Sequence, residues 1–571
     1  MKPMPSLDDL LSELEEEKIK FGADGKRTRM LLASLGRRRF SDAEPLIRFH
    51  ESLLFIRAFA QSPATFQLAS ELLSTFANRV ERARSSGADL TPFDYIEWSG
   101  IAGTTIYGTF SYDIARWLAH RYPSKVDVEW DRYEKKERLG SALQRFLPLL
   151  EEDLLVEANI PYLTWLYAAR EGAESDLIWL LRRFENLQIA EKEKAALYDS
   201  LELPIKWRLD DPRASRTQNI RKARKIFYHL EPLIRRSDVS LAEELDSPPL
   251  KLEKLSRSQG AETLDMVRAA TTARYRELYG ITHGDAENVV RADAGRGVEV
   301  YLWGLPPERR LPLRAYHAGL TLKNGVPINY IEGITLFERM ELGFNTFYTF
   351  REGETAWVYA KVLRLLRQIV GVTCFSIDPY QIGFNNEEAI ESGAFWFYRK
   401  LGFRPTQEGL IKLVEAEEKK IRADREYRTP ARVLRRLSTR HMIYEMAGAS
   451  KGDWDRFQVR NLGLKVQRRM AEEFKGYAEK ARNASINEVA RALACEPKDF
   501  DEIERKAFDN LALVLALIPG LDRWPDEEKN HIAQIVRGKA GPDESLYARL
   551  LQGHKRLRDA VIKLGSVHPR A

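Results

Sequence analysis

The stretch LRAYHAGLTLKNGVPINYIEGITLF, residues 313–337, determines how the middle of this chain folds. It consists of two runs rich in β-branched and aromatic residues, with the pair Asn324-Gly325 between them. Asn-Gly between such runs is a strong hairpin signal, because a type I′ turn needs a positive φ at both of its central positions. The stretch therefore predicts two antiparallel strands, over 313–322 and 326–337.

The segments around the hairpin extend it into a mixed sheet. Strand-like runs occupy 298–303 before it, and 344–350 and 372–377 after it. A helical pattern over 358–369 joins the last two runs, and a second helix is predicted over 386–400. A helix between two strands makes a crossover, so the strands 344–350 and 372–377 are expected to be parallel neighbours.

The rest of the chain shows helical patterns. Before the sheet segment, the clearest of them cover 43–61, 64–84, 138–156 and 175–190. Ser247-Pro248-Pro249 marks a linker, and from residue 409 onward the pattern is helical again. We therefore expect a protein of the α+β class, in which a mixed-sheet module is flanked by an all-α domain at each end. The expected domains are 1–250, 255–410 and 411–571.

The composition is that of an ordinary globular protein. The excess of Lys and Arg over Asp and Glu is 90 − 84 = +6 in 571 residues, too small to indicate a nucleic-acid or membrane partner. Two cysteines, Cys374 and Cys495, cannot form a disulfide framework, which fits a reducing compartment. The longest apolar run, 511–518, is far shorter than the about 20 residues of a membrane span. The N-terminus lacks the pattern of a secretory signal, so we expect a cytoplasmic protein without a membrane partner.

The residues after the strand 372–377 form a recognisable pattern. Asn385-Asn386-Glu387-Glu388-Ala389 leads into AFWFYRKLGF, residues 394–403. Together with the strand order, this pattern resembles the GNAT superfamily of acyl-CoA-dependent N-acyltransferases, over residues 255–410. In that family an Asn after the fifth strand precedes a helix that ends in a Tyr, a basic residue and Gly-Phe. The resemblance implies that pantetheine and pyrophosphate lie where the strands 344–350 and 372–377 separate.

The resemblance also implies a phosphate-binding loop before the helix 358–369. The family pattern is Arg or Gln, two residues, Gly, one residue, then Gly or Ala, and its backbone N–H groups hold the pyrophosphate. The segment 350–356 reads FREGETA; one alignment matches Arg351 and Ala356, and another matches Gly353. A backbone N–H near Phe347–Thr349 would meet the reaction's oxyanion. The candidates for binding acyl-CoA are Phe347, Tyr348, Thr349, Arg351, Gly353, Thr355, Ala356 and Asn385.

Two acidic residues lie in the same loop. Glu352 and Glu354 would stand beside a polyanion, and each like-charge contact at ~4 Å costs about 1 kcal/mol in water. Acidic residues are also common in the first turn of a helix, where they favour the helix dipole. Whether these glutamates face the phosphates therefore decides how well the loop would bind CoA.

Candidate catalytic residues follow from the resemblance and from the chemistry. The family's Tyr corresponds to Tyr398, which would donate a proton to the departing CoA thiolate; alternatively, its ring only packs the helix onto the sheet. No motif identifies the general base, but a carboxylate with a raised pKa suits that role. Glu332 and Glu338, on the third strand and in the turn after it, are candidates, and so are Glu341 and His317.

The predicted function is transfer of an acyl group from acetyl-CoA or another acyl-CoA to an amine on a small molecule or peptide. One alternative keeps the fold and uses an aminoacyl-tRNA, which the basic stretches 213–225 and 432–440 would contact. A second alternative is a non-catalytic module that binds a partner. No metal is expected, because the histidines form neither an HExxH motif nor a cluster with cysteine. The oligomeric state stays open.

Overall fold

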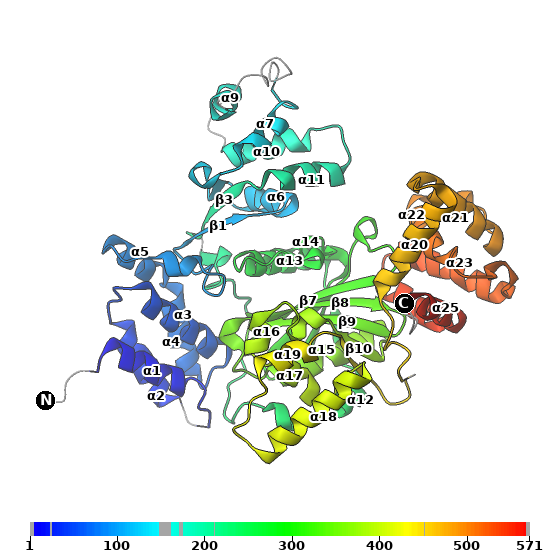
Figure 1. The fold of residues 1–571 in the computed structure, drawn as a ribbon. Coiled ribbons are helices and arrows are strands. Elements are labelled where there is room, and N and C mark those ends of the chain that lie inside the picture. The colour runs from blue at the N-terminus through cyan, green and yellow to red at the C-terminus, as the bar shows by residue number, and fades with distance from the viewer. Residues whose placement is uncertain are drawn as a thin grey trace. The chain divides into compact units, whose positions relative to one another are not determined.

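The computed structural model describes residues 5–22, 25–147, 162–170, 175–210, 212–449 and 451–566 (Figure 1). The chain forms two compact units. Unit 1 comprises Met1–Pro232, Glu262–Thr282 and Lys323–Pro327, and unit 2 comprises Leu233–Ala261, His283–Leu322 and Ile328–Ala571. The units therefore do not follow the linear division into 1–250, 255–410 and 411–571, since the last helices belong to the same unit as the sheet.

Unit 1 begins with helices. Their bounds are α1 (Leu7–Glu17), α2 (Lys26–Gly36), α3 (Ala43–Ala58), α4 (Pro63–Ser74) and α5 (Ala77–Ser85). Ser6 caps α1 in a capping box with Asp9, and the Ser62 hydroxyl caps α4 by accepting a hydrogen bond from the Thr65 N–H. The helix predicted over 43–61 is present, and the pattern over 64–84 forms two helices, α4 and α5.

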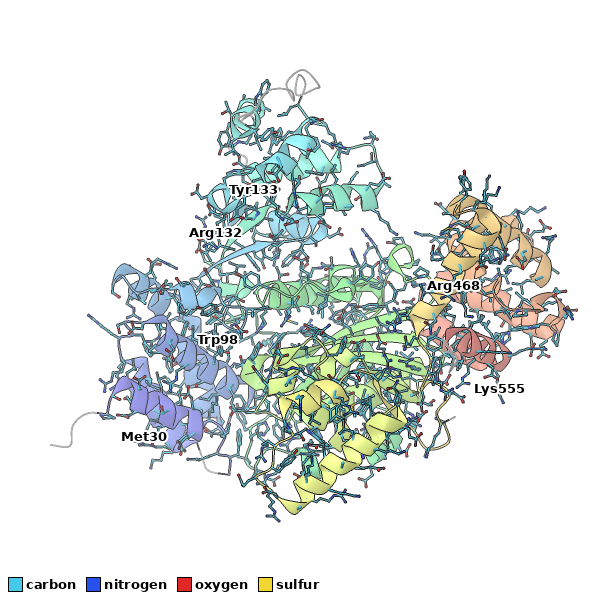
Figure 2. All side chains as sticks on the ribbon, viewed as in Figure 1. Met30, Trp98, Arg132, Tyr133, Arg468 and Lys555 are labelled. Carbon is cyan, nitrogen blue, oxygen red and sulfur yellow. The ribbon has the colours of Figure 1, made fainter. Side chains whose placement is uncertain are left out.

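The remainder of unit 1 contains a small sheet, so the prediction of an all-α N-terminal domain is wrong. Strands β1 (Thr105–Thr109), β2 (Val126–Val128) and β3 (Pro204–Arg208) are antiparallel, in the order β1-β3-β2. Each has five residues or fewer, which is too short for an alternating pattern to stand out among helices. The guanidinium of Arg132, labelled in Figure 2, lies 3.8 Å from the centre of the Tyr107 ring on β1.

Helices surround this small sheet. They are α6 (Tyr112–Arg121), α7 (Lys136–Leu143), α9 (Tyr162–Ala169), α10 (Asp176–Glu185) and α11 (Glu191–Leu201). Trp207 of β3 is fully buried in the core that the helices and strands share. Of the helix predicted over 138–156, the first part is observed as α7, and residues 148–156 lie outside the described residues.

Unit 2 is built on a nine-stranded mixed sheet in the order β11-β12-β10-β9-β8-β7-β6-β5-β4. The strands are β4 (Leu252–Lys254), β5 (Val290–Gly295), β6 (Val298–Trp303), β7 (Ala315–Lys323), β8 (Val326–Leu336), β9 (Arg339–Thr346), β10 (Cys374–Ile377), β11 (Arg404–Pro405) and β12 (Met442–Glu445). Helix α12 (Leu241–Asp246) precedes its longer strands, whereas most of α13 (Arg257–Thr272) and all of α14 (Tyr279–Thr282) belong to unit 1. The mixed α+β class predicted from the sequence is confirmed.

The predicted hairpin is present. Strands β7 and β8 are neighbours in the sheet, and φ is 48° at Asn324 and 84° at Gly325, as a type I′ turn requires. A Cβ atom at Gly325 would come within 1.9 Å of the carbonyl oxygen of Arg221. Glycine is therefore needed there for its conformation and for the space around it.

The crossover prediction is also confirmed, because β9 and β10 are parallel and joined by α15 (Thr355–Val370). Strand β8 is antiparallel to β9. The bounds of β9 differ from the prediction, since the strand covers Arg339–Thr346 and not 344–350. At the start of β9, charged residues alternate with the buried Met340 and Leu342. Such a half-buried strand has no continuous apolar run, so the sequence pattern did not show where β9 begins.

The part of the chain after residue 411 contains a strand, so the prediction of an all-α C-terminal domain is wrong. Strand β12 pairs antiparallel with both β10 and β11, which places it inside the sheet. It follows α18 (Glu408–Ala423) and α19 (Ala431–Leu437), and its four residues are too few for a recognisable pattern. The helices after it are α20 (Val459–Phe474), α21 (Ala478–Leu493), α22 (Glu502–Leu515), α23 (Asp526–Ala540), α24 (Glu544–Gly553) and α25 (Lys555–Gly565).

Helix α15 covers one face of β9, because the rings of Phe344 and Tyr359 are in contact with centroids 5.0 Å apart. Successive residues of a strand point to opposite faces, so Glu341, Gly343 and Asn345 belong to the other face. The helix predicted over 386–400 is divided at Gly393, whose φ is 67°. The two pieces are α16 (Glu387–Glu391) and α17 (Ala394–Lys400).

Candidate active site

A cavity of about 660 Å³ lies where β9 and β10 separate. The pairing of the two strands ends at Glu341 and Ser376, whereas β9 continues to Thr346. Beyond that point the cavity is lined by β8, β9, the start of α15 and residues of α16 and α17. Its volume is within the range of small-molecule and cofactor sites. The lining includes Arg235, Arg236, Tyr330, Glu332, Phe344, Arg351, Glu352, Gly353, Thr355, Ala356, Gln381, Asn386 and Tyr398.

The side chain of Gln381 occupies the gap in the ladder beyond β10. Its Nε2 donates to the Leu342 carbonyl oxygen at 2.8 Å, and its Oε1 accepts from the Phe344 N–H at 3.3 Å. A neighbouring strand would otherwise bind these backbone groups. A side chain can rotate away more readily than a strand, so β9 offers hydrogen-bonding groups that a ligand with amides can compete for. No sequence motif marked Gln381.

Tyr398 lines this cavity from α17. Tyr398 is only 4% exposed. Its ring contacts the rings of Tyr359, Phe397 and Phe403, with centroids 5.2 to 5.7 Å apart. Burial raises the pKa of the Tyr398 hydroxyl above its usual value. The hydroxyl is therefore protonated at neutral pH, which is the state that a proton donor needs.

Glu332 lines the same cavity from β8. Burial raises the pKa of its carboxyl, and the hydroxyl of Tyr316, which donates to Oε1, opposes this effect. The register pairs Glu332 with Gly343, so the carboxyl extends over the part of β9 that carries no side chain. A carboxylate with a raised pKa in a cavity is a suitable general base.

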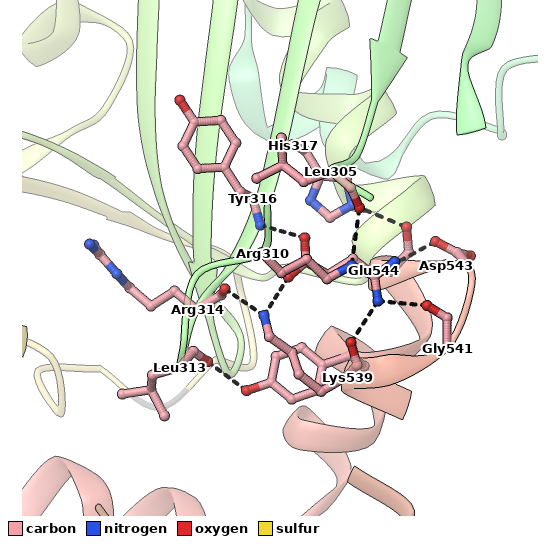
Figure 3. A network of polar contacts seen from close by, with 12 residues as sticks. Leu305, Arg310, Leu313, Arg314, Tyr316, His317, Lys539, Gly541, Asp543 and Glu544 are labelled. Carbon is pink, nitrogen blue, oxygen red and sulfur yellow. Dashed lines mark hydrogen bonds and ion pairs between the residues drawn. The ribbon is translucent and has the colours of Figure 1, made fainter. Parts of the chain in front are cut away.

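Tyr316 is held by the C-terminal helices through the network in Figure 3. Its N–H donates to Oε2 of Glu544 at 3.2 Å, and Glu544 forms a buried ion pair with Lys539. Lys539 in turn donates to the Arg314 carbonyl oxygen at 2.9 Å, and Arg310 donates to the Lys539 carbonyl oxygen at 2.6 Å. Because the Tyr316 hydroxyl reaches Glu332, helices α23 and α24 position a residue that contacts the candidate base.

Glu338 is not at this cavity, so its prediction as a general base is corrected. It lies in the turn between β8 and β9, where its carboxylate pairs with Arg558 of α25. It also accepts from the indole Nε1 of Trp454 at 2.7 Å. A carboxylate engaged by a guanidinium and an indole stabilises the turn, and it lies outside the cavity that Tyr398 lines.

The other two candidate bases also lie elsewhere. Glu341 lines a second cavity and stands 3.9 Å from the guanidinium of Arg339. His317 is buried, with Nε2 3.2 Å from the Ser545 hydroxyl, and burial lowers the pKa of its imidazole. Glu332 is therefore the candidate base that shares a cavity with Tyr398.

The predicted phosphate loop reaches the cavity through Arg351, Gly353, Thr355 and Ala356. They stand at or before the first turn of α15, whose first N–H groups have no acceptor within the helix and favour an anion. The Arg351 guanidinium pairs with Glu388 and lies 3.9 Å from the centre of the Tyr348 ring. Two further cations line the cavity, Arg235 and Arg236, and no sequence pattern marked either of them.

The two loop glutamates have different environments. Glu354 is 1% exposed, forms an ion pair with Arg296 and accepts from the Ile234 N–H at 3.1 Å. It is therefore turned into the protein and away from any phosphate in the cavity. Glu352 remains in the cavity lining.

Four predicted cofactor-binding residues are not among the lining residues: Phe347, Tyr348, Thr349 and Asn385. The first three follow β9, and Tyr348–Phe350 forms a 3₁₀ turn. The Phe347 N–H donates to the Ile328 carbonyl oxygen at 3.0 Å, so it is not available to an oxyanion. Asn385 has a left-handed φ of 54°, and its neighbour Asn386 is the residue that lines the cavity and caps α16.

The basic stretches proposed for tRNA are partly buried or paired. Arg216 is 3% exposed and forms an ion pair with Glu51. Arg221 donates to the Thr263 hydroxyl at 2.8 Å. In the second stretch, Arg435 pairs with Glu387 at 2.7 Å. These arginines are engaged with other residues of the protein, which leaves fewer of them for a phosphate backbone.

Comparison with known proteins found no matching family model, no matching curated protein and no matching solved structure. Within the described part of the chain, no helix is long and apolar enough to cross a membrane. The same residues contain no group of three or more His, Cys, Asp or Glu side chains that could hold a metal ion.

Proposed function

We propose that unit 2 transfers an acyl group from an acyl-CoA to an amine in the cavity between β9 and β10. The observation that carries this proposal is the meeting of Glu332 and Tyr398 in one cavity. A base and an acid at the end of a separated pair of parallel strands agree with the family resemblance. The order of β10, β12 and β11 supports it too, since β12 supplies a strand after β11 that the sequence pattern did not reveal.

The proposed reaction needs two proton transfers. The amine nitrogen attacks the thioester carbonyl carbon, and Glu332 takes the proton that the nitrogen loses. As the C–N bond forms and the C–S bond breaks, the thiolate takes the hydroxyl proton of Tyr398. The products are an amide and free CoA. Glu332 then releases its proton to solvent and Tyr398 takes one from solvent through the cavity, which restores both groups.

The cavity also suits the phosphates and amides of an acyl-CoA. Arg235, Arg236 and Arg351 line it beside the first turn of α15, which favours anions. The backbone groups of Leu342 and Phe344 are bound by the side chain of Gln381 and become available when it rotates. Pantetheine carries amides that can form the same hydrogen bonds.

Binding of acyl-CoA tests this function most directly. The purified protein is examined by mass spectrometry for co-purifying CoA and is then titrated with acetyl-CoA and longer acyl-CoAs in a thermal-shift assay. A ligand at 100 times its dissociation constant stabilises the native state by about 2.7 kcal/mol, so binding is readily seen. Pantetheine, which lacks the phosphates, is the matched control and should bind more weakly. No shift with any acyl-CoA would leave the tRNA-dependent and the non-catalytic alternatives.

The two loop glutamates give a first prediction. Glu352→Gln should lower the Kd for CoA about fivefold at low ionic strength, because it removes one like-charge contact worth about 1 kcal/mol. Glu354→Gln should leave this Kd unchanged and lower the melting temperature, since it breaks the ion pair with Arg296. Calorimetry at low salt measures both Kd values, because salt screens the repulsion. Unchanged or weaker binding by Glu352→Gln would mean that Glu352 does not face the phosphates.

The tRNA-dependent alternative has less support than acyl-CoA. Arg216, Arg221 and Arg435, which belong to the two basic stretches, are bound by other residues of the protein. If acyl-CoA fails to bind, a gel-shift assay with charged tRNA separates this alternative from a non-catalytic module.

A further inference from the structure

A second cavity, of about 400 Å³, lies on the same face of the sheet as Glu332. Residues 332, 334 and 336 of β8 alternate onto one face, and the last two, Ile334 and Leu336, line this cavity. Neighbouring residues on one face of a strand are about 7 Å apart. The second cavity therefore begins about 7 Å from the candidate base.

The turn after β10 connects the two cavities. Asp378 and Pro379 line the second cavity, and the next two residues, Tyr380 and Gln381, line the first. On β9, Glu341 lines the second cavity and Gly343 lines the first, and these residues are also adjacent on one face. The two cavities are thus consecutive along the sheet.

The second cavity is positively charged. Its lining contains the cations Arg314, Arg339, Arg440 and Arg460 and the anions Glu341 and Asp378, which gives 4 − 2 = +2. His441 adds no charge at neutral pH, because burial and the nearby Arg339 lower its pKa to about 3. The excess charge therefore comes from arginines.

The two carboxylates of this cavity already have partners. Glu341 stands 3.9 Å from Arg339, and Asp378 accepts from the Tyr380 N–H at 2.8 Å. By contrast, Arg314, Arg440 and Arg460 form no ion pair with a carboxylate among the described residues. The carbonyl of Arg314 is held by Lys539, and its guanidinium points away from that network (Figure 3). Three guanidinium groups are thus available to an anion.

From this arrangement we infer that the amine acceptor carries a carboxylate or phosphate group, which the arginines of the second cavity bind while the amine lies beside Glu332. This inference rests on the proposed acyl transfer. Arginine suits the role because its planar guanidinium binds carboxylate and phosphate through two parallel hydrogen bonds. The distance from the base requires an acceptor whose anion and amine are separated by an extended chain.

The test uses pairs of acceptors that differ in the anion. The ω-amino carboxylates of increasing chain length are compared with their carboxamides, and ω-aminoalkyl phosphates with the matching alcohols, by release of free thiol from acetyl-CoA. In the series whose anion fits the site, we expect kcat/KM for the anionic acceptor to exceed that for the matching neutral acceptor by about tenfold or more. This ratio should be greatest at one chain length. The two series distinguish carboxylate from phosphate.

A double variant, Arg440→Gln with Arg460→Gln, should abolish this preference. It should raise KM for the anionic acceptor about tenfold and leave KM for acetyl-CoA unchanged. Both arginines are exposed, so the double variant is expected to fold, which thermal denaturation verifies. The matched control is Arg436→Gln with Arg468→Gln, which changes two exposed arginines of α19 and α20 that do not line the cavity; Arg468 is labelled in Figure 2.

The outcomes separate this inference from the proposed function. Equal use of neutral and anionic amines, or a double variant that behaves as the control does, overturns the acceptor class and leaves acyl transfer intact. If no amine is acylated, the proposed function fails. Calorimetry with the longest ω-amino carboxylate and ω-aminoalkyl phosphate then tests whether the second cavity binds an anion. Binding to the wild-type protein that is lost in the double variant supports the anion site. If the wild-type protein binds neither compound, the anion site is overturned.

Discussion

Glu332→Gln is expected to lower kcat/KM for acyl transfer by about 10²–10⁴-fold, the usual contribution of a general base. Glutamine has the same shape and its amide oxygen can still accept from the Tyr316 hydroxyl, so the fold should be retained. The measurement is steady-state release of free thiol from acetyl-CoA, with thermal denaturation to verify folding.

Glu338→Gln is the matched control for this variant, because the sequence pattern gave both residues the same standing. It weakens the contacts with Arg558 and Trp454, so it should lower the melting temperature while the folded fraction keeps its kcat. If Glu338→Gln lost turnover and Glu332→Gln kept it, the assignment of the base would be wrong.

The same carboxyl predicts a pH dependence for the proposed activity of the wild-type protein. Burial disfavours the carboxylate and raises the pKa of Glu332 above its ordinary 4.5. Only the carboxylate can take a proton, so kcat/KM should fall as pH falls through this raised value. Tyr316→Phe removes a hydrogen bond that stabilises the carboxylate, and the acid limb should then move to still higher pH. An acid limb at the same pH in both proteins would contradict a role for Glu332.

Tyr398→Phe should lower kcat by about 10²–10⁴-fold and leave KM for the acyl donor nearly unchanged. The variant removes one oxygen and keeps the ring contacts with Tyr359 and Phe403, so it should fold normally. Equal losses in kcat and kcat/KM would indicate an interaction made only in the transition state.

The matched control is Tyr359→Phe. Tyr359 is fully buried beside Tyr398, its hydroxyl has no hydrogen-bond partner among the described residues, and it is not among the residues that line the cavity. Removing its hydroxyl should leave turnover unchanged. Near-normal turnover of Tyr398→Phe would show that Tyr398 only packs α17 against the sheet.

Local features of the sequence predicted several parts of unit 2 correctly. The Asn324-Gly325 pair imposes a hairpin, because few other pairs accept two positive φ values. The helical period of α15 between two strands requires a crossover, and hence the parallel order of β9 and β10. The sequence also marked Tyr398, Arg351, Gly353, Thr355 and Ala356, which line the cavity, because they belong to short continuous patterns; their roles stay predictions.

Other features depended on contacts between distant residues, and the tertiary structure alone decided them. Strand β12 has four residues, too few for the sequence pattern to identify a strand. Its pairing with β10 and β11 in the structure identifies it. Glu332 and Glu338 look alike in sequence, and they differ because Arg558, 220 positions away, pairs with one of them. Arg296 likewise turns Glu354 away from the cavity. A side chain's chemistry depends on its burial and its partners, and in this protein those partners come from remote segments of the chain.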